Sequence, residues 1–331
     1  MLAALATLAL AAALASSQAE LLGITEQVAL ESISPSSGAT KPIGGPVSYE
    51  LQAQGLSTVD SATGTYFLLG FNSSSTRANL VGINIASGMV TTDIAMPFAE
   101  SAFVGVGQSI DVDPTDGNIF AGGRMETHGP HVIGKIDIKS GKFTPIASLN
   151  ATFLPVLGAA TAFIPNTRQL FVQLGTASAI DIFGVNVETG KITKIPQDPE
   201  EGRVLTTMAL DAKTRSLIGL GVKPSNGTLE RTLVRLDPVS HSYTTVGDIP
   251  AWLVESGGES ALDTFSRTLY WIGQPTGAKP TDPFHLVGLN ADTGAVVSSP
   301  LLVLRLRPAT CCRPCPDAQR PARRIVPTPQ T

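Results

Sequence analysis

Two short stretches of the sequence bring together side chains that proteins use as metal ligands. In the first, Glu126, His128 and His131 lie within one short segment, and a carboxylate with two imidazoles is a donor set that suits zinc. A Gly-Pro step separates the two histidines. We therefore expect a loop in which these polar side chains are solvated rather than joined around a metal.

The second stretch is a run of aspartates, Asp111, Asp113 and Asp116, followed by Gly117. It is similar to the start of a calcium-binding EF-hand loop. The spacing is too long for that loop, and no Glu follows where the loop would need its last ligand. We therefore expect a hairpin turn at this position.

The sequence contains no motif that prepares a nucleophile or binds a phosphate. Neither the Gly-x-Ser-x-Gly elbow nor the Gly-x-x-x-x-Gly-Lys-[Ser/Thr] loop occurs. Of the remaining histidines, His241 stands in a predicted turn and His285 opens a predicted strand. No Ser–His–Asp set follows from the spacing, so the sequence offers no catalytic constellation.

All of these residues belong to a repeat. In most copies a short β run ends in an anchor Asp that begins a turn of the form Asp-x-x-x-[Gly/Arg], and a second apolar run then ends near a Gly; the third copy has Ile in place of the Asp. The copies recur at intervals of roughly 50 residues. Their anchors are Asp60, Asp113, Ile164, Asp211 and Asp263. We expect each anchor Asp to accept a backbone hydrogen bond from two residues on, which closes the turn.

A second anchor lies downstream in every copy, and a further β run follows it. These second anchors are Asn84, Asp137, Asn186, Asp237 and Asn290. A Gly ends the turn in four of the copies, as the left-handed position of a hairpin requires. Each unit therefore contains four antiparallel strands in roughly 50 residues, which is typical of one β-propeller blade.

The number of units predicts an all-β chain that folds as a six-bladed propeller over residues 20–303. Complete blades are expected at about 51–98, 99–148, 149–199, 200–249 and 250–303, and 20–50 matches a sixth blade without its inner strand. We expect that strand to come from the C-terminal end, near 315–319, where the Pro-rich sequence does not suit a central strand. The first and last blade are thus predicted to be incompletely closed.

Charge and cysteine are concentrated at the C-terminal end. The net charge is −4 and no basic stripe occurs, which excludes nucleic acid as a partner. Residues 304–331 are rich in Arg and Pro and hold the three cysteines, Cys311, Cys312 and Cys315. We interpret this tail as a truncated or mis-joined gene product, with a native disordered basic tail as the alternative. In an oxidising compartment its thiols would serve disulfide formation or dimerisation.

The N-terminal end predicts secretion. Residues 1–19 combine an uncharged Ala/Leu run with small residues before two cleavage points, after Ala15 or after Ala19. The run is short for a bilayer span, and no other stretch is apolar enough to be transmembrane. Three Asn-x-Ser/Thr sequons, at Asn72, Asn150 and Asn226, fall in predicted loops and are candidate glycosylation sites of an extracellular protein.

The segment LDTFSRTLYWIG, residues 262–273, resembles a blade of the six-bladed propellers of the TolB-like superfamily, which includes the YWTD, NHL and gluconolactonase-like groups. Tyr270-Trp271 is similar to the start of a YWTD motif, but Ile-Gly follows in place of Thr-Asp. The resemblance covers about residues 21–303 and includes no family-specific functional motif. It implies an architecture and leaves the activity open.

The resemblance also implies a candidate metal site. Members of the gluconolactonase-like group hold a divalent metal at the central channel with carboxylate and amide oxygens. In this chain Glu259, Gln108 and Gln54 precede inner strands and would supply such oxygens to Ca²⁺ or Mg²⁺. The alternative is that these three side chains line a wet channel and that the protein takes no cofactor.

Two functions from different classes follow as hypotheses. The first is a secreted, non-catalytic binding or scaffold module that presents loops to a protein or glycan partner. It rests on the absence of a catalytic constellation across the repeats. The alternative is a metal-dependent hydrolase or lactonase of the gluconolactonase-like type, with Glu259 among the ligands of a site at the channel mouth.

Overall fold

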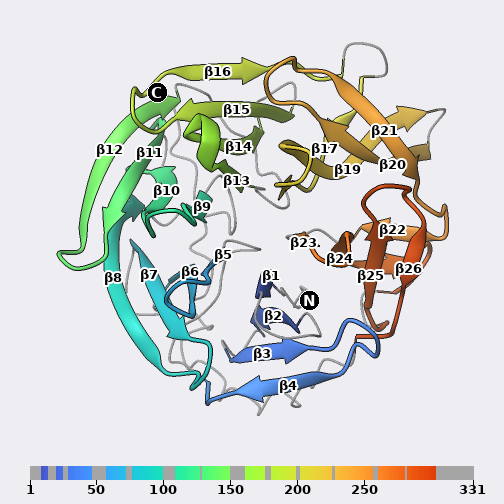
Figure 1. The fold of residues 1–331 in the computed structure, drawn as a ribbon, viewed down its shortest axis with the longest axis horizontal. Helices are drawn as coiled ribbons and strands as arrows, with labels where there is room; N and C mark the ends of the chain where they lie inside the picture. Colours follow the sequence, from blue (N-terminus) through green and yellow to red (C-terminus); the bar gives the residue numbers. More distant parts are fainter. Residues whose placement is uncertain are drawn as a thin grey trace, which may run out of the picture.

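The strands of the chain form six antiparallel sheets around a central axis (Figure 1). This computed structural model describes residues 9–13, 20–24, 29–46, 57–71, 77–99, 109–126, 129–149, 161–175, 180–198, 202–225, 228–255, 260–279 and 282–302. Within these ranges the only helix is the short 3-10 turn η1 (Pro165–Thr167), and no helix is long and apolar enough to cross a membrane. The predicted all-β, six-bladed propeller is confirmed.

Each sheet is one blade, numbered here in chain order. Blades 1 and 2 contain β1 (Ala9–Ala13), β2 (Glu20–Ile24), β3 (Leu30–Ile33), β4 (Thr40–Ile43), β5 (Ser57–Asp60), β6 (Thr65–Phe71), β7 (Arg77–Asn84) and β8 (Val90–Ala99). Blades 3 and 4 contain β9 (Ser109–Val112), β10 (Ile119–Arg124), β11 (His131–Asp137), β12 (Lys142–Leu149), β13 (Thr161–Ile164), β14 (Gln169–Gly175), β15 (Ile180–Asn186) and β16 (Ile192–Ile195). Blades 5 and 6 contain β17 (Val204–Leu205), β18 (Ala209–Asp211), β19 (Ser216–Ser225), β20 (Thr228–Leu236), β21 (Tyr243–Asp248), β22 (Leu253–Glu255), β23 (Ala261–Asp263), β24 (Thr268–Pro275), β25 (His285–Asn290) and β26 (Val296–Ser298).

The innermost strand of blades 5 and 6 is divided into two pieces. Both β17 and β18 pair with β19, and both β22 and β23 pair with β24. The other four blades have the simple order of four strands from the axis to the rim. The two-hairpin unit that the sequence repeats is therefore the unit of the fold.

The hairpin turns are closed by the anchor residues, as predicted. Asp60 Oδ1 accepts a hydrogen bond from the Ala62 N–H at 3.0 Å, and Asn84 Oδ1 accepts one from the Ala86 N–H at 3.1 Å. The same bond to the residue two positions on is made by Asp113, Asp137, Asn186, Asp211, Asp237, Asp263 and Asn290. Because the side chain satisfies the turn backbone, each turn is specified locally by its own residues.

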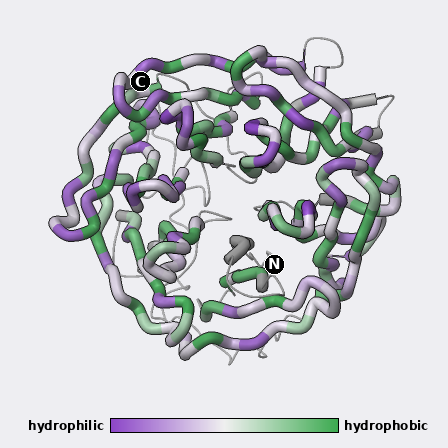
Figure 2. Tube along the Cα trace, viewed as in Figure 1, coloured by the Kyte–Doolittle hydropathy of each residue, from purple (hydrophilic) through white to green (hydrophobic). Residues whose placement is uncertain are grey.

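The hydrophobic core lies between neighbouring blades. Six clusters of buried apolar side chains occur, one at each junction; Leu80, Phe98 and Ile110, for example, join blades 2 and 3. Middle strands such as β10 are almost wholly buried, whereas rim strands such as β12 are half exposed. Apolar and polar residues consequently alternate along much of the chain (Figure 2). Burial of apolar area between sheets thus holds the ring together.

The first blade corrects the expectation that the ring is incompletely closed. Its innermost strand is β1, which pairs with β2 along all of its residues and lies beside the inner strands β5 and β23 (Figure 1). Residues near 315–319, where we expected this strand, lie outside the described residues.

A shared core also joins blade 6 to blade 1. Leu21 and Ile33 of blade 1 pack in one cluster with Tyr270, Leu286 and Leu302 of blade 6. Sequence reasoning did not predict that β1 completes blade 1, because it assigned residues 1–19 entirely to a targeting segment. The targeting segment itself stays a prediction.

Candidate ligand site in the central channel

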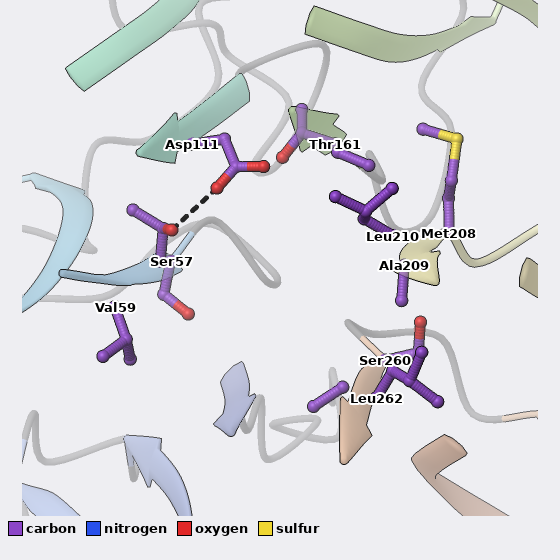
Figure 3. Close-up of a pocket in the computed structure, with 12 residues that line it drawn as sticks. Ser57, Val59, Asp111, Thr161, Met208, Ala209, Leu210, Ser260 and Leu262 are labelled. Atoms are coloured by element: carbon purple, nitrogen blue, oxygen red, sulfur yellow. Dashed lines mark hydrogen bonds between the residues drawn. The ribbon is translucent and has the colours of Figure 1, made fainter. Parts of the chain in front are cut away.

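The inner strands surround a cavity of about 230 Å³ at the axis of the ring (Figure 3). Residues of blades 2 to 6 line it, and five of them carry side-chain oxygen atoms: Ser57, Thr58, Asp111, Thr161 and Ser260. The remaining lining is mostly alanine and other apolar residues, such as Met208 and Leu210. The cavity therefore combines polar groups with small apolar surfaces, as binding pockets in proteins commonly do.

Asp111 is the only charged residue among the described residues of this lining, and it connects three blades. Its Oδ1 accepts a hydrogen bond of 2.8 Å from Thr58 Oγ1 of blade 2, which the dashed line in Figure 3 marks. Its Oδ2 accepts one of 2.7 Å from the Phe163 N–H of blade 4, and Oδ1 also accepts from the Val112 N–H at 2.8 Å. An ionised carboxylate has about four lone-pair sites, and the hydrogen bonds from described residues occupy three of them.

Burial raises the pKa of the Asp111 carboxyl to about 6, although the hydrogen bonds from Thr58, Val112 and Phe163 favour the ionised form. The carboxyl is thus mostly ionised at neutral pH and takes up a proton in mildly acidic solution. Within the described lining it is the group whose charge responds to pH near the physiological range.

This raised pKa predicts a pH-dependent stability that Asp111→Asn removes. A group with a folded-state pKa above its unfolded value stabilises the fold at low pH, and the contribution is lost as the pH rises through about 6. Between pH 4.5 and pH 8 the wild type should lose about 2 kcal/mol of unfolding free energy relative to the Asn variant. Urea unfolding of both proteins at the two pH values measures this difference. Equal changes in both would show that Asp111 titrates normally.

The channel presents donors opposite this acceptor. In an antiparallel ladder alternate residues direct their N–H and C=O groups away from the partner strand. The Phe163 N–H points away from its partner strand, β14, and donates to Asp111. Thr161 Oγ1 likewise donates at 2.8 Å to the channel-facing carbonyl of Ile110. Leu210 and Leu262 hold the position of Phe163 in the next two blades. By the same alternation their N–H groups face the channel.

The residue equivalent to Asp111 is an alanine in blades 4 and 5. Asp111 of blade 3 faces the Phe163 N–H of blade 4. The equivalent residue facing Leu210 of blade 5 is Ala162 of blade 4, and the one facing Leu262 of blade 6 is Ala209 of blade 5. An alanine side chain cannot accept a hydrogen bond. Ser260 Oγ is buried at the same cavity and has no hydrogen-bond partner among the described residues. The walls of blades 5 and 6 thus offer polar groups to a ligand.

The aspartate run forms the predicted hairpin turn. Asp113 Oδ1 accepts from the Thr115 N–H at 2.9 Å and from Thr115 Oγ1 at 2.6 Å. The guanidinium of Arg168 from blade 4 pairs with Asp113 and lies 3.6 Å from Asp116. Asp111 instead binds groups at the channel, so its role differs from that of the two turn carboxylates, Asp113 and Asp116.

The histidine cluster is not a solvated loop in the way that the sequence suggested. His131 is the first residue of β11, stands opposite Arg124 and is fully buried, whereas Glu126 is exposed. Burial and the charge of Arg124 lower the pKa of His131 to about 3, so its imidazole is neutral. The expectation of solvation is wrong for His131, because β11 begins earlier than the Gly-Pro step indicated. His128 lies outside the described residues.

The candidate metal ligands Glu259, Gln108 and Gln54 lie outside the described residues, so their prediction stays open. In sequence they immediately precede the cavity lining: Glu259 adjoins Ser260, and the two glutamines stand shortly before Asp111 and Ser57. The sequons at Asn72, Asn150 and Asn226 are also outside the described residues. Among the residues that the structure does describe, no three His, Cys, Asp or Glu side chains form a metal-binding group.

Sequence reasoning missed Asp111 as a channel residue, yet the repeat contains the signal. Counting two residues back from each first anchor gives Thr58, Asp111, Ala162, Ala209 and Ala261. One position in the series is charged and three are alanine. An alignment on the anchors, read position by position, would have identified the aspartate as the exceptional group at the axis.

No protein-family model matches the sequence, and neither does any curated protein. Solved structures do match. TolB from Acinetobacter baumannii aligns with a TM-score of 0.53 and 8% identity, over 89% of this chain and 64% of that one, so this chain spans slightly under two thirds of TolB. A chain of a nidogen/laminin complex aligns with a TM-score of 0.57 and 10% identity, over 85% and 92%.

A lectin, SapL1 in complex with alpha methyl fucoside, aligns with a TM-score of 0.56 and 12% identity, over 90% of this chain and 97% of the lectin. At such identities the matches establish the fold alone. The chain has a six-bladed β-propeller fold, and it is similar in fold to TolB.

Proposed function

We propose that this protein is a secreted, non-catalytic binding module whose central cavity receives one neutral sugar unit of a glycan. The observation that carries the proposal is the composition of the cavity. Asp111 lies across the channel from backbone donors and from the hydroxyl of Ser260, and within the described part of the chain that hydroxyl has no hydrogen-bond partner and Asp111 keeps one lone-pair site unused. A polyol needs acceptors, donors and small apolar surfaces close together.

The size and charge of the cavity narrow the ligand class. At about 230 Å³ it is smaller than the cavities of roughly 300–1,000 Å³ that hold drug-sized molecules, so it suits a single ring. Among the described lining residues Asp111 is the only charged one, and the protein carries a net charge of −4, so an acidic sugar would be repelled. Methyl groups of Ala162, Ala209 and Ala261 offer flat contacts for the C–H face of a neutral sugar.

The fold is compatible with this role. The lectin SapL1 was solved with alpha methyl fucoside, and the nidogen/laminin structure is a protein complex; both contain chains of this fold. The two matches show that the architecture serves binding in other proteins. They leave the choice of ligand to the cavity of this chain, on which the proposal rests.

The proposal predicts that Asp111→Asn weakens sugar binding at least about tenfold, since a hydrogen bond to a charged acceptor is worth about 1.5–3 kcal/mol. Isothermal calorimetry with a panel of neutral monosaccharide glycosides, alpha methyl fucoside among them, measures it. Asp116→Asn is the matched control, because Asp116 belongs to the same blade but lies in the turn after β9. A sugar that binds both variants equally, or a panel without any binder, would contradict the proposal.

The metal-dependent hydrolase or lactonase remains the second candidate, and one observation favours it. Asp111 adds a carboxylate oxygen to the channel close in sequence to Gln108, and oxygen donors suit Ca²⁺ and Mg²⁺. The same calorimeter distinguishes the two functions. Stoichiometric uptake of Ca²⁺ or Mg²⁺ that Glu259→Gln abolishes, together with lactone hydrolysis, would establish the enzyme and displace the binding module.

A further inference from the structure

The innermost strand of blade 1 is joined to the remainder of the blade only through a short segment. β1 pairs with β2 in antiparallel register, from Ala9 opposite Ile24 to Ala13 opposite Glu20. Residues 14–19 connect the two strands in sequence. Both predicted cleavage points, after Ala15 and after Ala19, fall within this segment. A cut at either point separates β1 from the propeller and leaves β2 intact.

A propeller without β1 would present a prepared pairing edge. Leu21, Leu22 and Ile24 of β2 are buried, and β3 already occupies the other edge of β2. The edge that β1 covers would then expose unpaired N–H and C=O groups toward the axis. Such an edge pairs readily with an extended peptide, which gains main-chain hydrogen bonds along its whole length.

The surroundings of this edge restrict which strand can occupy it. β1 lies beside β5 and β23, the inner strands of blades 2 and 6, so a bound strand has neighbours on both sides. The inner strands converge at the axis, where three of the twelve described lining residues are alanine and two are serine, and the resident strand has the sequence ALAAA. Small apolar residues therefore suit the position, and bulky or charged ones would be crowded or desolvated.

We propose that the inner edge of β2 is a strand-accepting site whose ligand is an extended segment of about five small apolar residues. In this chain Ala9–Ala13 is the resident ligand. The site accepts the same strand as a separate peptide when the chain is cut between β1 and β2. The N-terminal segment thereby has a structural role besides the predicted targeting one. This proposal is independent of sugar binding at the cavity.

A cut-and-exchange experiment on the full chain tests the site. A protease recognition sequence is placed between Ala15 and Ser16, and the purified protein is folded and then cut. The cut protein is unfolded in urea, separated from the released fragment 1–15, and refolded with an excess of a fluorescent peptide that spans residues 5–15. We expect the refolded propeller to take up one labelled peptide per chain and to regain the thermal midpoint of the uncut protein.

The control peptide carries Leu10→Pro and Ala11→Pro. Successive residues of a strand direct their N–H groups to opposite edges, so one of the two prolines must remove a hydrogen bond to β2. Its uptake should be weaker by roughly tenfold or more. The proposal is overturned if the cut protein refolds to the same midpoint without any peptide. It is also overturned if both peptides bind equally, or if neither binds while the uncut protein refolds normally.

Discussion

Gly38→Ala is expected to destabilise the propeller by about 3 kcal/mol, because two penalties act at one atom. Gly38 ends the second turn of blade 1 with a φ of +67°, a conformation that a β-carbon disfavours. A β-carbon there would also stand 2.2 Å from the carbonyl oxygen of Leu301, in the last described part of blade 6. Backbone cannot yield as a flexible side chain can, so the junction between blades 6 and 1 would have to open.

Gly64→Ala is the matched control for this prediction. Gly64 has nearly the same φ, +63°, but a β-carbon at that position has nothing within 4 Å. It should cost only the left-handed strain of about 1 kcal/mol. Urea unfolding of both variants separates the two contributions. If the two alanine variants are equally stable, blade 1 does not abut blade 6 at Gly38.

The contact tested by Gly38 recurs around the ring. The second turn of a blade meets the rim strand of the preceding blade: Gly88 meets Ile43, Gly190 meets Ile146, and Gly294 meets Gly247, all through main-chain atoms. The junction of blades 6 and 1 is therefore built like three of the others. This contact joins blade 6 to blade 1 whichever residues supply the innermost strand.

Much of this architecture could be predicted from the repeat, because its information is local. Anchor residues such as Asp60 and Asn84 close turns within their own hairpins, so period, strand content and blade number follow from spacing. The role of β1 could not be predicted in the same way. An Ala/Leu run has no anchor, and the same composition that suits a crowded inner strand also suits a targeting segment.

The candidate site was harder to predict for a related reason. Asp111 acts through Thr58 and Phe163, its neighbours in two other blades, and these lie far from it in sequence. The sequence analysis considered Asp111 only as part of an aspartate run that is similar to a calcium-binding loop. The predicted ligands Glu259, Gln108 and Gln54 followed from a resemblance, whereas the cavity is defined by packing between blades.

Packing between blades also determines the second large effect that we expect. In blades 2 to 6 the last residue of the first turn has a positive φ, and in blades 4 and 6 it is an arginine directed at the anchor of the preceding blade. Arg267 donates to both carboxylate oxygens of Asp211, at 2.6 and 2.7 Å, and to Asp292 at 2.7 Å. The Asp211 side chain is 0% exposed, and that of Arg267 is 12% exposed.

The electrostatics of this pair are those of a buried, compensated charge. Burial disfavours ionisation of Asp211, but the hydrogen bonds from Arg267 and Thr214 and the charges of Arg267 and Arg235 lower its pKa to about 2. The carboxylate is therefore ionised under all ordinary conditions. Removing one partner of such a pair leaves charge without its compensation, which typically costs about 3–5 kcal/mol.

Arg267→Ala should accordingly destabilise the protein by about 3 kcal/mol, at the lower end because Arg235 stays 3.2 Å from Asp211. Arg215→Ala is the natural control. Arg215 has the same backbone conformation in blade 5, with φ of +55° against +57°, but it is exposed, and the anchor of the preceding blade is Ile164. Alanine at that position should change the unfolding free energy by less than about 0.5 kcal/mol.

Acid unfolding provides an independent readout of the same pair. A carboxylate with a depressed folded-state pKa stabilises the fold above its unfolded value of 3.8, and the contribution is lost as the pH falls toward about 2. The gap in stability between wild type and Arg267→Ala should therefore narrow below pH 4 and stay constant between pH 5 and 8. A gap that persists undiminished at pH 2 would mean that Arg267 stabilises the junction by packing of its side chain rather than by pairing with Asp211.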